Sequence, residues 1–391
     1  MKLFSIILSS IVFLGCSHSI QEQISVPLIE IDVDQTKTLN LSDFFTDISY
    51  VSLSDSFLVG IIETAKIYDD KLFLLTNKSI LIFDINSGDL LLNVRHLGRG
   101  PGEYISLYDM LYDKNENTIE LLDMNAKKVL KYSFDNQFID EFTTSFFSFS
   151  FYKIDQFTYL FYNNNVMSDV TNHKLIQYDS KTSKIKASHF PIDRHLANYF
   201  FVIDVNNFGS MVNSSFHFSP SDTIYGFTEN YGLYPKYVLN FGKYHTPKSF
   251  YKENYIDIYD FSVKAVEKSY IYTYTNFCEN DYIAALYFRN DQKLYWVLYD
   301  KNIQTVWTID SWIDDFHFNT SVNIDYNNVQ FIMDNDYLYF FLQPDQFINL
   351  MNDKKGSKFS PNDWDMFNHI YSLDFSEESN PILVKCKFKK S

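Results

Sequence analysis

Residues 63–96 read ETAKIYDDKLFLLTNKSILIFDINSGDLLLNVRH and contain four short apolar runs separated by turn-forming residues. The runs cover residues 63–68, 72–75, 79–84 and 90–96, and Asp, Asn, Lys, Ser and Gly fill the breaks between them. Apolar runs of this length with such boundaries predict β-strands joined by tight turns. Residues 63–96 are therefore expected to fold as four consecutive strands.

The same rhythm repeats along the rest of the chain. Residues 107–142 again divide into four runs, and less regular units follow at about 146–192, 200–245, 270–311 and 320–388. Four-stranded units at a spacing of roughly 40 to 50 residues are typical of β-propeller blades. The sequence therefore predicts an all-β fold, a six-bladed β-propeller of four-stranded antiparallel blades. In the sixth unit, residues 337–342 and 369–375 are expected to form a hairpin around an insertion at 343–368.

Two apolar segments precede the first unit, at residues 26–33 and 48–53. One of them is expected to pair with the last blade, because closing the ring in that way removes an exposed sheet edge. No linker rich in Pro, Gly or Ser divides residues 24–391. We therefore expect a single propeller domain over residues 24–391, larger than a usual single core because repeats add one unit at a time.

The N-terminus has the pattern of an export signal. Lys2 is followed by an uncharged run over residues 3–14 and then by Gly15 and Cys16. A bilayer span needs about 20 apolar residues, so this shorter run is typical of a signal peptide. The small residue directly before Cys16 resembles the lipobox of bacterial lipoproteins. Phe13 departs from this pattern, which more often has Leu or Val three residues before the cysteine.

This resemblance implies a membrane anchor. We expect residues 1–15 to be removed, Cys16 to be lipidated, and residues 16–23 to form a short tether. The lipid chains would supply the membrane affinity. An ordinary cleaved signal peptide is the alternative.

The composition limits the possible partners. The formal net charge is −16, and removing residues 1–15 takes away Lys2 alone among the charged residues, which leaves −17. Binding of nucleic acid depends on Lys and Arg that neutralise phosphates, so no nucleic-acid partner is expected. Besides Cys16, the chain has only Cys278 and Cys386, too few for a disulfide framework. Both are expected to be buried free thiols, with one disulfide between the last blades as the alternative.

Residues 97–104, LGRGPGEY, hold three of the 11 glycines within five positions. With the preceding IFD at 82–84 and NSGD at 86–89, this string resembles the hallmark of the six-bladed β-propeller lipoproteins common in Bacteroidota. The resemblance covers residues 40–145 well and the remainder through blade rhythm. It implies the fold and a location outside the cytoplasm, but most members have no assigned activity.

The residues after Cys16 bear on the location within the envelope. In this phylum an acidic run after the lipidated cysteine marks surface display, and residues 17–23, SHSIQEQ, lack one. The resemblance therefore implies an outer-membrane lipoprotein that faces the periplasm.

The segment at 97–104, here called the glycine-rich loop, contains the first candidate ligand-binding residues. Its glycines permit unusual backbone conformations and Pro101 fixes one φ, so a defined loop is expected. Because it links the outermost strand of one blade to the innermost strand of the next, it is expected to cross the disc face towards the central channel. There Arg99 and Glu103 are candidates for an ion pair or a ligand contact, and Tyr104 is a candidate for stacking on a sugar or for capping the core.

The alternative is a structural corner in which Arg99 and Glu103 satisfy backbone groups. A phosphate-binding loop is the wrong interpretation, because the segment lacks the Lys and the Ser or Thr of that motif and leads into a strand.

His217 and His317 each lie between two phenylalanines, in segments about two blades apart. Strand alternation sends each His to the face opposite its neighbours. If both face the channel they are candidate ligand-binding residues; the alternative is a pair of hydrogen-bonded surface or core histidines. No His-x-His, His-Glu-x-x-His, Cys-x-x-Cys or Gly-x-Ser-x-Gly pattern accompanies them. The sequence therefore assigns no catalytic residue, no metal-ligand set and no cofactor.

Two functional hypotheses follow. The first is a non-enzymatic binding or scaffold protein of the cell envelope, linked to glycan uptake or to an envelope protein partner. The alternative is a propeller enzyme, a lyase or hydrolase acting on glycan or peptide, whose residues converge at the central channel without leaving a local motif. An enzyme predicts clustered titratable groups with perturbed pKa values there, whereas a scaffold predicts a shallow, aromatic or merely polar face.

Overall fold

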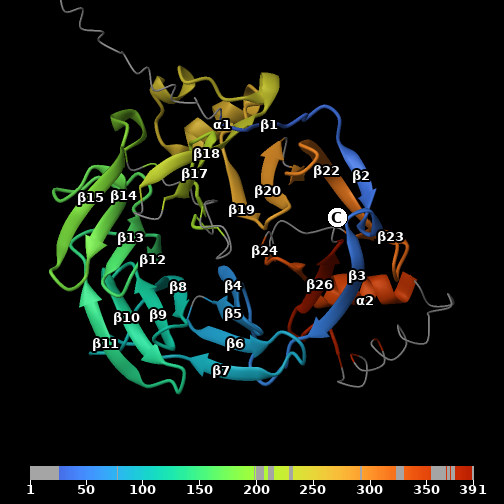
Figure 1. Ribbon diagram of the computed structural model, residues 1–391, viewed down its shortest axis with the longest axis horizontal. Helices are drawn as coiled ribbons and strands as arrows, with labels where there is room; N and C mark the ends of the chain where they lie inside the picture. Colours follow the sequence, from blue (N-terminus) through green and yellow to red (C-terminus); the bar gives the residue numbers. More distant parts are fainter. Residues whose placement is uncertain are drawn as a thin grey trace, which may run out of the picture.

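The computed structural model describes residues 26–76, 78–197, 199, 207–209, 215–228, 232–290, 293–322, 330–353, 367, 370 and 375–389. Within these residues, six β-sheets stand in a ring around a central axis (Figure 1). In Figure 1 strands β4, β8, β19 and β24 lie nearer the axis than the other labelled strands of their sheets. The chain is a six-bladed β-propeller, which confirms the predicted fold class.

Blades 1 to 3 are each built from consecutive stretches of chain, with every strand antiparallel to the next. Their strands, from the axis outwards, are β4 (Thr64–Tyr68), β5 (Lys71–Leu75), β6 (Ile80–Asp84) and β7 (Leu90–Val94) in blade 1; β8 (Leu107–Asp113), β9 (Thr118–Asp123), β10 (Lys128–Ser133) and β11 (Phe138–Thr143) in blade 2; and β12 (Ser150–Lys153), β13 (Thr158–Tyr162), β14 (His173–Asp179) and β15 (Lys184–Pro191) in blade 3.

Blades 4 to 6 each take their outermost strand from the N-terminal part of the chain. Their strands are β16 (Ser215–Phe216), β17 (Thr223–Phe227), β18 (Leu233–Asn240) and β1 (Leu28–Glu30) in blade 4; β19 (Tyr274–Glu279), β20 (Ile283–Asn290), β21 (Lys293–Asp300), β22 (Thr305–Asp314) and β2 (Lys37–Asn40), with β23 (Thr320–Val322) also on β22, in blade 5; and β24 (Phe331–Met333), β25 (Tyr337–Leu342), β26 (Ile382–Phe388) and β3 (Phe45–Ser52) in blade 6.

We call residues 28–52 the strap, because they run along the rim of three blades (Figure 1). β1 and β2 pair in parallel with β18 and β22, whereas β3 pairs antiparallel with β26. The predicted closure of the ring by one of the two N-terminal segments is confirmed for the second, since residues 48–52 lie within β3. The first segment contains β1 and extends blade 4.

The sixth blade corrects one prediction. β25 pairs with β26 through six residue pairs, from Tyr337↔Lys387 to Leu342↔Ile382, and with β24 on its other side. The hairpin expected between residues 337–342 and 369–375 is therefore wrong. The chain leaves β25, forms helix α2 (Pro344–Asp353), and returns much later in the sequence as β26.

Among the described residues, the core of the ring consists of six apolar clusters, one at each interface between neighbouring blades. Strand alternation explains this distribution, because successive side chains point to opposite faces of a sheet. In β5, for example, Leu72 and Leu74 pack towards blade 6, whereas Phe73 and Leu75 pack towards blade 2. Central strands such as β9 and β13 are buried at every position. Cys278 and Cys386 lie in this core as free thiols.

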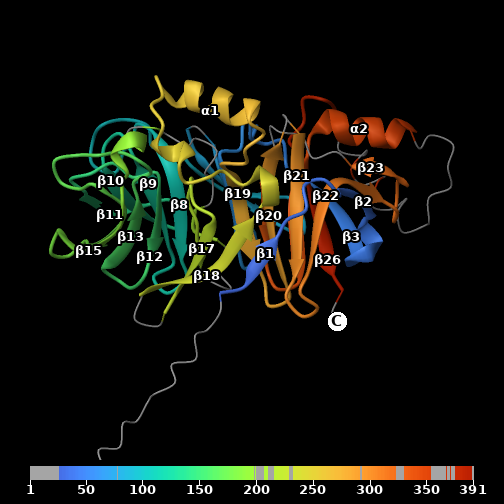
Figure 2. The same ribbon diagram turned by 90° about the horizontal axis from the view of Figure 1, so that it is seen from above.

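Helices cover one face of the disc (Figure 2). α1 (Ile258–Glu267) begins where the Asp257 carboxylate accepts the amide of Asp260, and its buried residues Phe261 and Ala265 belong to a seventh apolar cluster. The short 3-10 helices are η1 (Leu41–Asp43), η2 (Arg194–Leu196), η3 (Gly242–Tyr244) and η4 (Phe250–Lys252). None of the helices in the described chain is long and apolar enough to cross a bilayer.

The innermost strands are also tied together by hydrogen bonds around the axis. At each of the six blade interfaces, at least one such bond joins residues that lie in or next to the innermost strands. In blade order these bonds join Lys66 to Asp109, the Phe151 amide to Asp109, Ser150 to Asn207, Ser219 to Thr273, Asn276 to the Phe331 carbonyl, and Gln330 to the Glu63 carbonyl. This inner ring of polar contacts surrounds the place where a ligand site is expected.

Candidate functional site

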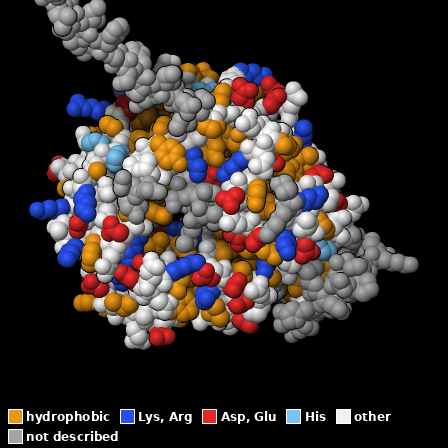
Figure 3. Space-filling view, viewed as in Figure 1, with side chains coloured by type: hydrophobic (Ala, Val, Ile, Leu, Met, Phe, Trp, Pro, Cys, Tyr) orange, Lys and Arg blue, Asp and Glu red, His pale blue; other side chains and the backbone are white. Residues whose placement is uncertain are grey.

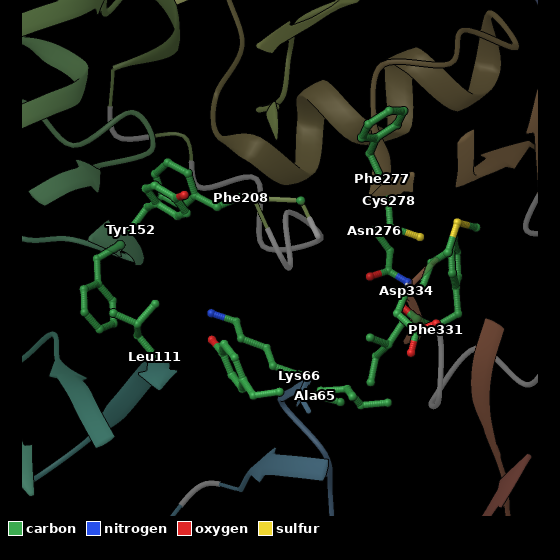
Figure 4. A pocket seen from close by; sticks show the side chains of 16 residues that line it. Ala65, Lys66, Leu111, Tyr152, Phe208, Asn276, Phe277, Cys278, Phe331 and Asp334 are labelled. Carbon is green, nitrogen blue, oxygen red and sulfur yellow. The ribbon is translucent and has the colours of Figure 1, made fainter. Parts of the chain in front are cut away.

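A cavity of about 110 Å³ lies on the propeller axis, and residues from all six blades line it (Figure 4). Its described lining is Ala65, Lys66, Ile67 and Tyr68 of blade 1, Leu111 of blade 2, Phe151 and Tyr152 of blade 3, Phe208 and Gly209 before β16, Asn276, Phe277 and Cys278 of blade 5, and Phe331, Ile332, Met333 and Asp334 of blade 6. Most of these side chains are apolar or aromatic. A concave, largely apolar pocket with a few polar groups is the usual form of a small-molecule site.

Lys66 supplies a charged group to the wall of this cavity. Its side chain extends into the cavity in Figure 4, and its ammonium donates to Asp109 Oδ1 at 2.6 Å and to the Met110 carbonyl at 2.7 Å. Burial of the ammonium acts to lower the pKa of Lys66. The Asp109 carboxylate raises this pKa by a larger amount, so it lies above its ordinary value. Lys66 is therefore a fixed cation at neutral pH.

Asp109 neutralises this cation inside the protein. Its side chain is only 6% exposed, and it also accepts the backbone amides of Met110 at 2.8 Å and Phe151 at 3.0 Å. A buried charge is tolerated when it is paired and hydrogen-bonded in this way. The ion pair therefore places an ammonium group in the cavity wall, while the pair as a whole carries no net charge.

Asn276 lies across the cavity from Lys66 in Figure 4. It has a positive φ of 58° at an irregularity in the pairing of β19 with β20. Such bulges re-aim side chains. The Asn276 amide nitrogen donates to the Phe331 carbonyl at 2.9 Å, which joins blade 5 to blade 6.

The thiol of Cys278 also belongs to this wall. Burial, reinforced by the nearby Glu279 carboxylate, raises the pKa of Cys278 well above its ordinary value. Since the thiolate is the reactive form of cysteine, a protonated Cys278 is a poor nucleophile.

The opposite side of the cavity is aromatic. The Tyr152 ring stacks on Phe208 with centroids 5.7 Å apart and an interplanar angle of 27°, and on Phe227 at 6.0 Å and 4°. These rings come from blades 3 and 4. Stacked rings of this kind present flat apolar surface to a ligand.

The structure places the glycine-rich loop at the junction of blades 1 and 2, away from the lining of the cavity. Gly102 packs on Phe138 of the outermost strand β11, and its amide donates to Glu141 of the same strand at 3.1 Å. Tyr104 is 1% exposed and its hydroxyl donates to the carbonyls of Lys78 and Val94. Tyr104 therefore anchors the loop in the core.

Glu103 and Arg99 differ in their surroundings. The Glu103 carboxylate accepts the amide of Gly100 at 2.8 Å, and a side chain at Gly98 would overlap it. Arg99 is exposed and has no hydrogen bond or ion pair with the described residues. Glu103 thus has the contacts of a structural corner, whereas Arg99 is available to a partner. Ligand contact by either residue stays a prediction.

The two predicted histidines also lie outside the cavity lining. His217 is fully buried and stacks on Tyr274, with ring centroids 5.6 Å apart. Burial lowers the pKa of His217 to about 3, so the ring is neutral, and neither ring nitrogen has a hydrogen-bond partner among the described residues. His217 is therefore buried like a core residue, but its ring nitrogens lack hydrogen bonds with described residues, which a buried histidine is expected to make.

The contacts of His317 are those of a residue that stabilises the fold. Its backbone amide donates to Asp314 Oδ1 at 2.9 Å, and its ring lies edge-on to Tyr50 at a centroid distance of 5.5 Å. The contacts of the described residues do not join His317 to His217. A shared site for the two histidines therefore has no geometric support, and a ligand role for either one stays a prediction.

Three carboxylates near the junction of blades 2 and 3 have the spacing of a metal site. Asp113, Glu116 and Glu120 place one oxygen each within 4.8 Å of one another. However, the ammonium of Lys153 lies among them, 3.0 Å from Glu116 and 2.7 Å from Glu120, and it also contacts Asp113. The cluster is therefore a partly buried ion-pair network that joins two blades, with Glu120 at its buried end.

Sequence reasoning missed the cavity residues Lys66, Tyr152 and Asn276. One signal was present, because Lys66 and Asp109 are charged residues inside the first strands of two successive units. A charge buried in an inner strand needs a partner of opposite charge, and the neighbouring inner strand can supply one. Asn276 has no comparable signal, since its orientation depends on the irregularity in β19.

Comparison with known proteins identifies the family. The chain belongs to the family of the domain of unknown function DUF4934, whose sequence profile matches residues 24–387. No curated protein matches the chain in sequence.

Two solved structures are similar to the chain. A presumed exported protein from Bacteroides fragilis is similar at 19% identity and a TM-score of 0.70, over 93% of this chain and 100% of that one. A member of the DUF4221 family from Bacteroides vulgatus is similar at 10% identity and a TM-score of 0.49, over 88% of this chain and 97% of that one. At these identities the similarity concerns the fold alone.

Proposed function

We propose that the protein is an exported, lipid-anchored propeller of the cell envelope that binds its ligand or partner without transforming it. The observation that carries the binding role is the axial cavity, to which all six blades contribute residues. Two of its polar groups, Lys66 and Asn276, belong to the inner ring of hydrogen bonds, so the fold itself preorganises them. Preorganisation reduces the entropic cost of holding a ligand.

The enzyme alternative has little support among the described cavity residues. Lys66 is paired with Asp109, and Asp334 accepts the amides of Asp336 and Tyr337 and the hydroxyl of Tyr339. The raised pKa of Cys278 makes that thiol unreactive. These side chains lack the base and nucleophile pair that covalent catalysis requires.

Location outside the cytoplasm is proposed from the signal-like residues 1–15, the lipobox resemblance at Cys16, and the presumed export of the Bacteroides fragilis protein. Cys16 lies outside the described residues. β1 enters from the face of the disc opposite to α1 and α2 (Figure 2). A tether of residues 16–23 would therefore hold the helix-covered face away from the bilayer.

On the face seen in Figure 3, acidic and basic side chains are interspersed.

Fractionation and ligand recovery test this proposal. The wild-type chain is expected in the outer-membrane fraction and the Cys16→Ser variant in the soluble envelope fraction. Protein purified from its native cells is expected to carry either a co-purifying partner protein or a bound small molecule, which denaturation releases for mass spectrometry. Recovery from the cytoplasm, or turnover of a bound compound into a product, would contradict the proposal.

A further inference from the structure

The axial cavity offers an incoming ligand few hydrogen-bonding groups. Of its 16 lining residues, five have polar side chains with N or O atoms: Lys66, Tyr68, Tyr152, Asn276 and Asp334. Both oxygens of Asp334 already accept hydrogen bonds. Asn276 donates its amide to Phe331, and the Tyr68 hydroxyl interacts with the backbone of Tyr112.

Lys66 has one donor left. A lysine ammonium has three N–H groups, and the described partners of Lys66 take two of them, at Asp109 and Met110. Because the side chain extends into the cavity (Figure 4), the third N–H can meet an oxygen acceptor of a ligand.

The charge balance limits what this acceptor can be. Asp109 already neutralises Lys66, and Lys66 is the one cationic side chain in the described lining. A ligand carboxylate would leave its own charge uncompensated in a largely apolar wall, which is costly. A neutral carbonyl, ether or hydroxyl oxygen meets the same N–H without that penalty.

The size and polarity of the cavity limit the rest of the ligand. At about 10 to 15 Å³ for each water-sized position, a cavity of about 110 Å³ has room for roughly 7 to 11 non-hydrogen atoms. A hexose such as glucose brings five hydroxyl groups in its ring form, and each one buried without a partner is penalised. A sugar therefore does not suit this cavity, and a glycan partner would bind elsewhere on the protein.

We infer that the axial cavity takes a compact, neutral, mainly apolar molecule that presents one oxygen acceptor to Lys66. This inference rests on the proposed binding function and names the ligand class. The aromatic walls from Tyr152, Phe208 and Phe331 would contact the apolar body of that molecule.

Three probes separate the ligand classes. Acetophenone and benzoate are planar and have equal numbers of non-hydrogen atoms, but only benzoate is charged, and glucose represents the sugars. The ε-methyl resonance of Met333, which lines the cavity, reports binding at this place in the wild-type protein. We expect acetophenone to shift the Met333 resonance in a saturable way and to bind at least tenfold more tightly than benzoate, with no shift from glucose.

Two variants test the role of Lys66. Lys66→Met removes the donor and is expected to weaken acetophenone binding by about tenfold, the loss typical of one hydrogen bond to a charged group. Lys78→Met, at an exposed lysine of the same blade, is expected to bind like the wild type. If Lys66→Met does not fold, the order of the three probes on the wild-type protein still decides the question.

Tighter binding of benzoate or glucose at Met333 would overturn the inferred ligand class and leave the proposed binding function in place. Failure of all three probes to shift Met333 would overturn the inference as well. The proposed function itself fails in a different experiment, through fractionation to the cytoplasm or turnover of the native ligand.

Discussion

Blades 1 to 3 and blades 4 to 6 are assembled differently. In the first group each blade is a run of antiparallel neighbours from one stretch of chain, whereas each blade of the second group is completed by a strand of the strap. The pairing of Leu28 with Val238 closes a loop of about 200 residues, while the pairing of Tyr68 with Lys71 closes a turn. Contacts distant in sequence cost more chain entropy to form. One half of the ring is therefore local, and the other depends on the N-terminus.

This difference has a functional consequence under the proposed anchoring. Cys16 lies close in sequence to β1, so a tether would connect the membrane to blades 4 to 6. The cavity, by contrast, is lined by all six blades. Because β2 and β3 complete blades 5 and 6, which supply Asn276 and Phe331, we expect loss of the strap to disturb this site as well as the fold.

The largest expected effect follows from removal of residues 26–33. This deletion takes away Ile29, Ile31 and Val33, which are 1%, 3% and 8% exposed. At about 1.5 to 3 kcal/mol for each buried aliphatic side chain, the free energy of unfolding should fall by about 5 kcal/mol or more. Urea unfolding followed by tryptophan fluorescence measures this change.

A matched pair of point variants controls for the deletion. Ile29→Ala should cost about 2 to 5 kcal/mol, as is typical of a buried isoleucine. Leu28→Ala, next in sequence but 51% exposed, should change stability by less than about 0.5 kcal/mol. Equal effects of the two variants would show that β1 is not packed on blade 4.

In the local half, the largest effect is expected at Lys153. Among the described residues, Lys153→Met leaves Lys131 as the cation paired with Glu116 and Glu120, and leaves Asp113 without an ion pair. Breaking a buried ion pair from one side costs about 3 to 5 kcal/mol, and thermal unfolding should show this loss. Lys184→Met, at an exposed lysine of β15, is the control and should leave the melting temperature unchanged.

A smaller effect, dependent on pH, is expected at the junction of blades 5 and 6. Buried Asp314 accepts the hydroxyl of Tyr50 in β3 and the amides of Phe316 and His317. Burial of Asp314 acts to raise its pKa, but the hydrogen bonds from His317 and Tyr50 lower it more, so its pKa lies below the ordinary value. The stabilisation is therefore complete above the ordinary carboxyl pKa and is lost as the pH falls through the lowered one.

Asp314→Asn should therefore cost about 1.5 to 3 kcal/mol at pH 7 and flatten the loss of stability on acidification. Urea unfolding at pH 7, 5 and 3.5 measures both effects. Asp310→Asn is the control, since Asp310 lies in the same strand, is exposed, and accepts the hydroxyls of Thr36 and Thr38. A parallel pH dependence of wild type and Asp314→Asn would refute the role of Asp314.

The smallest effect is expected in the glycine-rich loop. Arg99→Ala should change the free energy of unfolding by less than about 0.5 kcal/mol, because Arg99 is exposed and lacks a described partner. Glu103→Gln should cost about 1 kcal/mol, since Glu103 holds the amide of Gly100. A large fall in melting temperature for Arg99→Ala would defeat a ligand role for Arg99.

The fold was predictable where the chain pairs with its neighbours in sequence. The runs at residues 63–96 and 107–142 gave the strands of blades 1 and 2 because alternation and turn residues are local signals. The pairing of β25 with β26 was predicted wrongly, because the long connection containing α2 separates these strands in sequence. The parallel additions of β1 and β2 have no signature in sequence periodicity.

The candidate site was less predictable than the fold. The glycines of the glycine-rich loop pointed to Arg99, Glu103 and Tyr104 as candidate site residues. In the structure, however, the loop needs glycine because it forms a corner packed on Phe138 and Glu141. The cavity depends on which residue of each inner strand faces the axis, and the bulge near Asn276 alters that order. Such geometry arises from packing between blades, which a single sequence does not display.

Hydrogen exchange of the intact protein in increasing urea tests the central distinction between the two halves most directly. Amides of β1, β18, β22 and β26 are predicted to lose protection together and at lower urea than those of β5, β6, β9 and β10, because release of the strap opens blades 4 to 6 as one cooperative unit. Loss of protection at the same urea concentration in all six blades would contradict this account and show that the ring unfolds as a single unit.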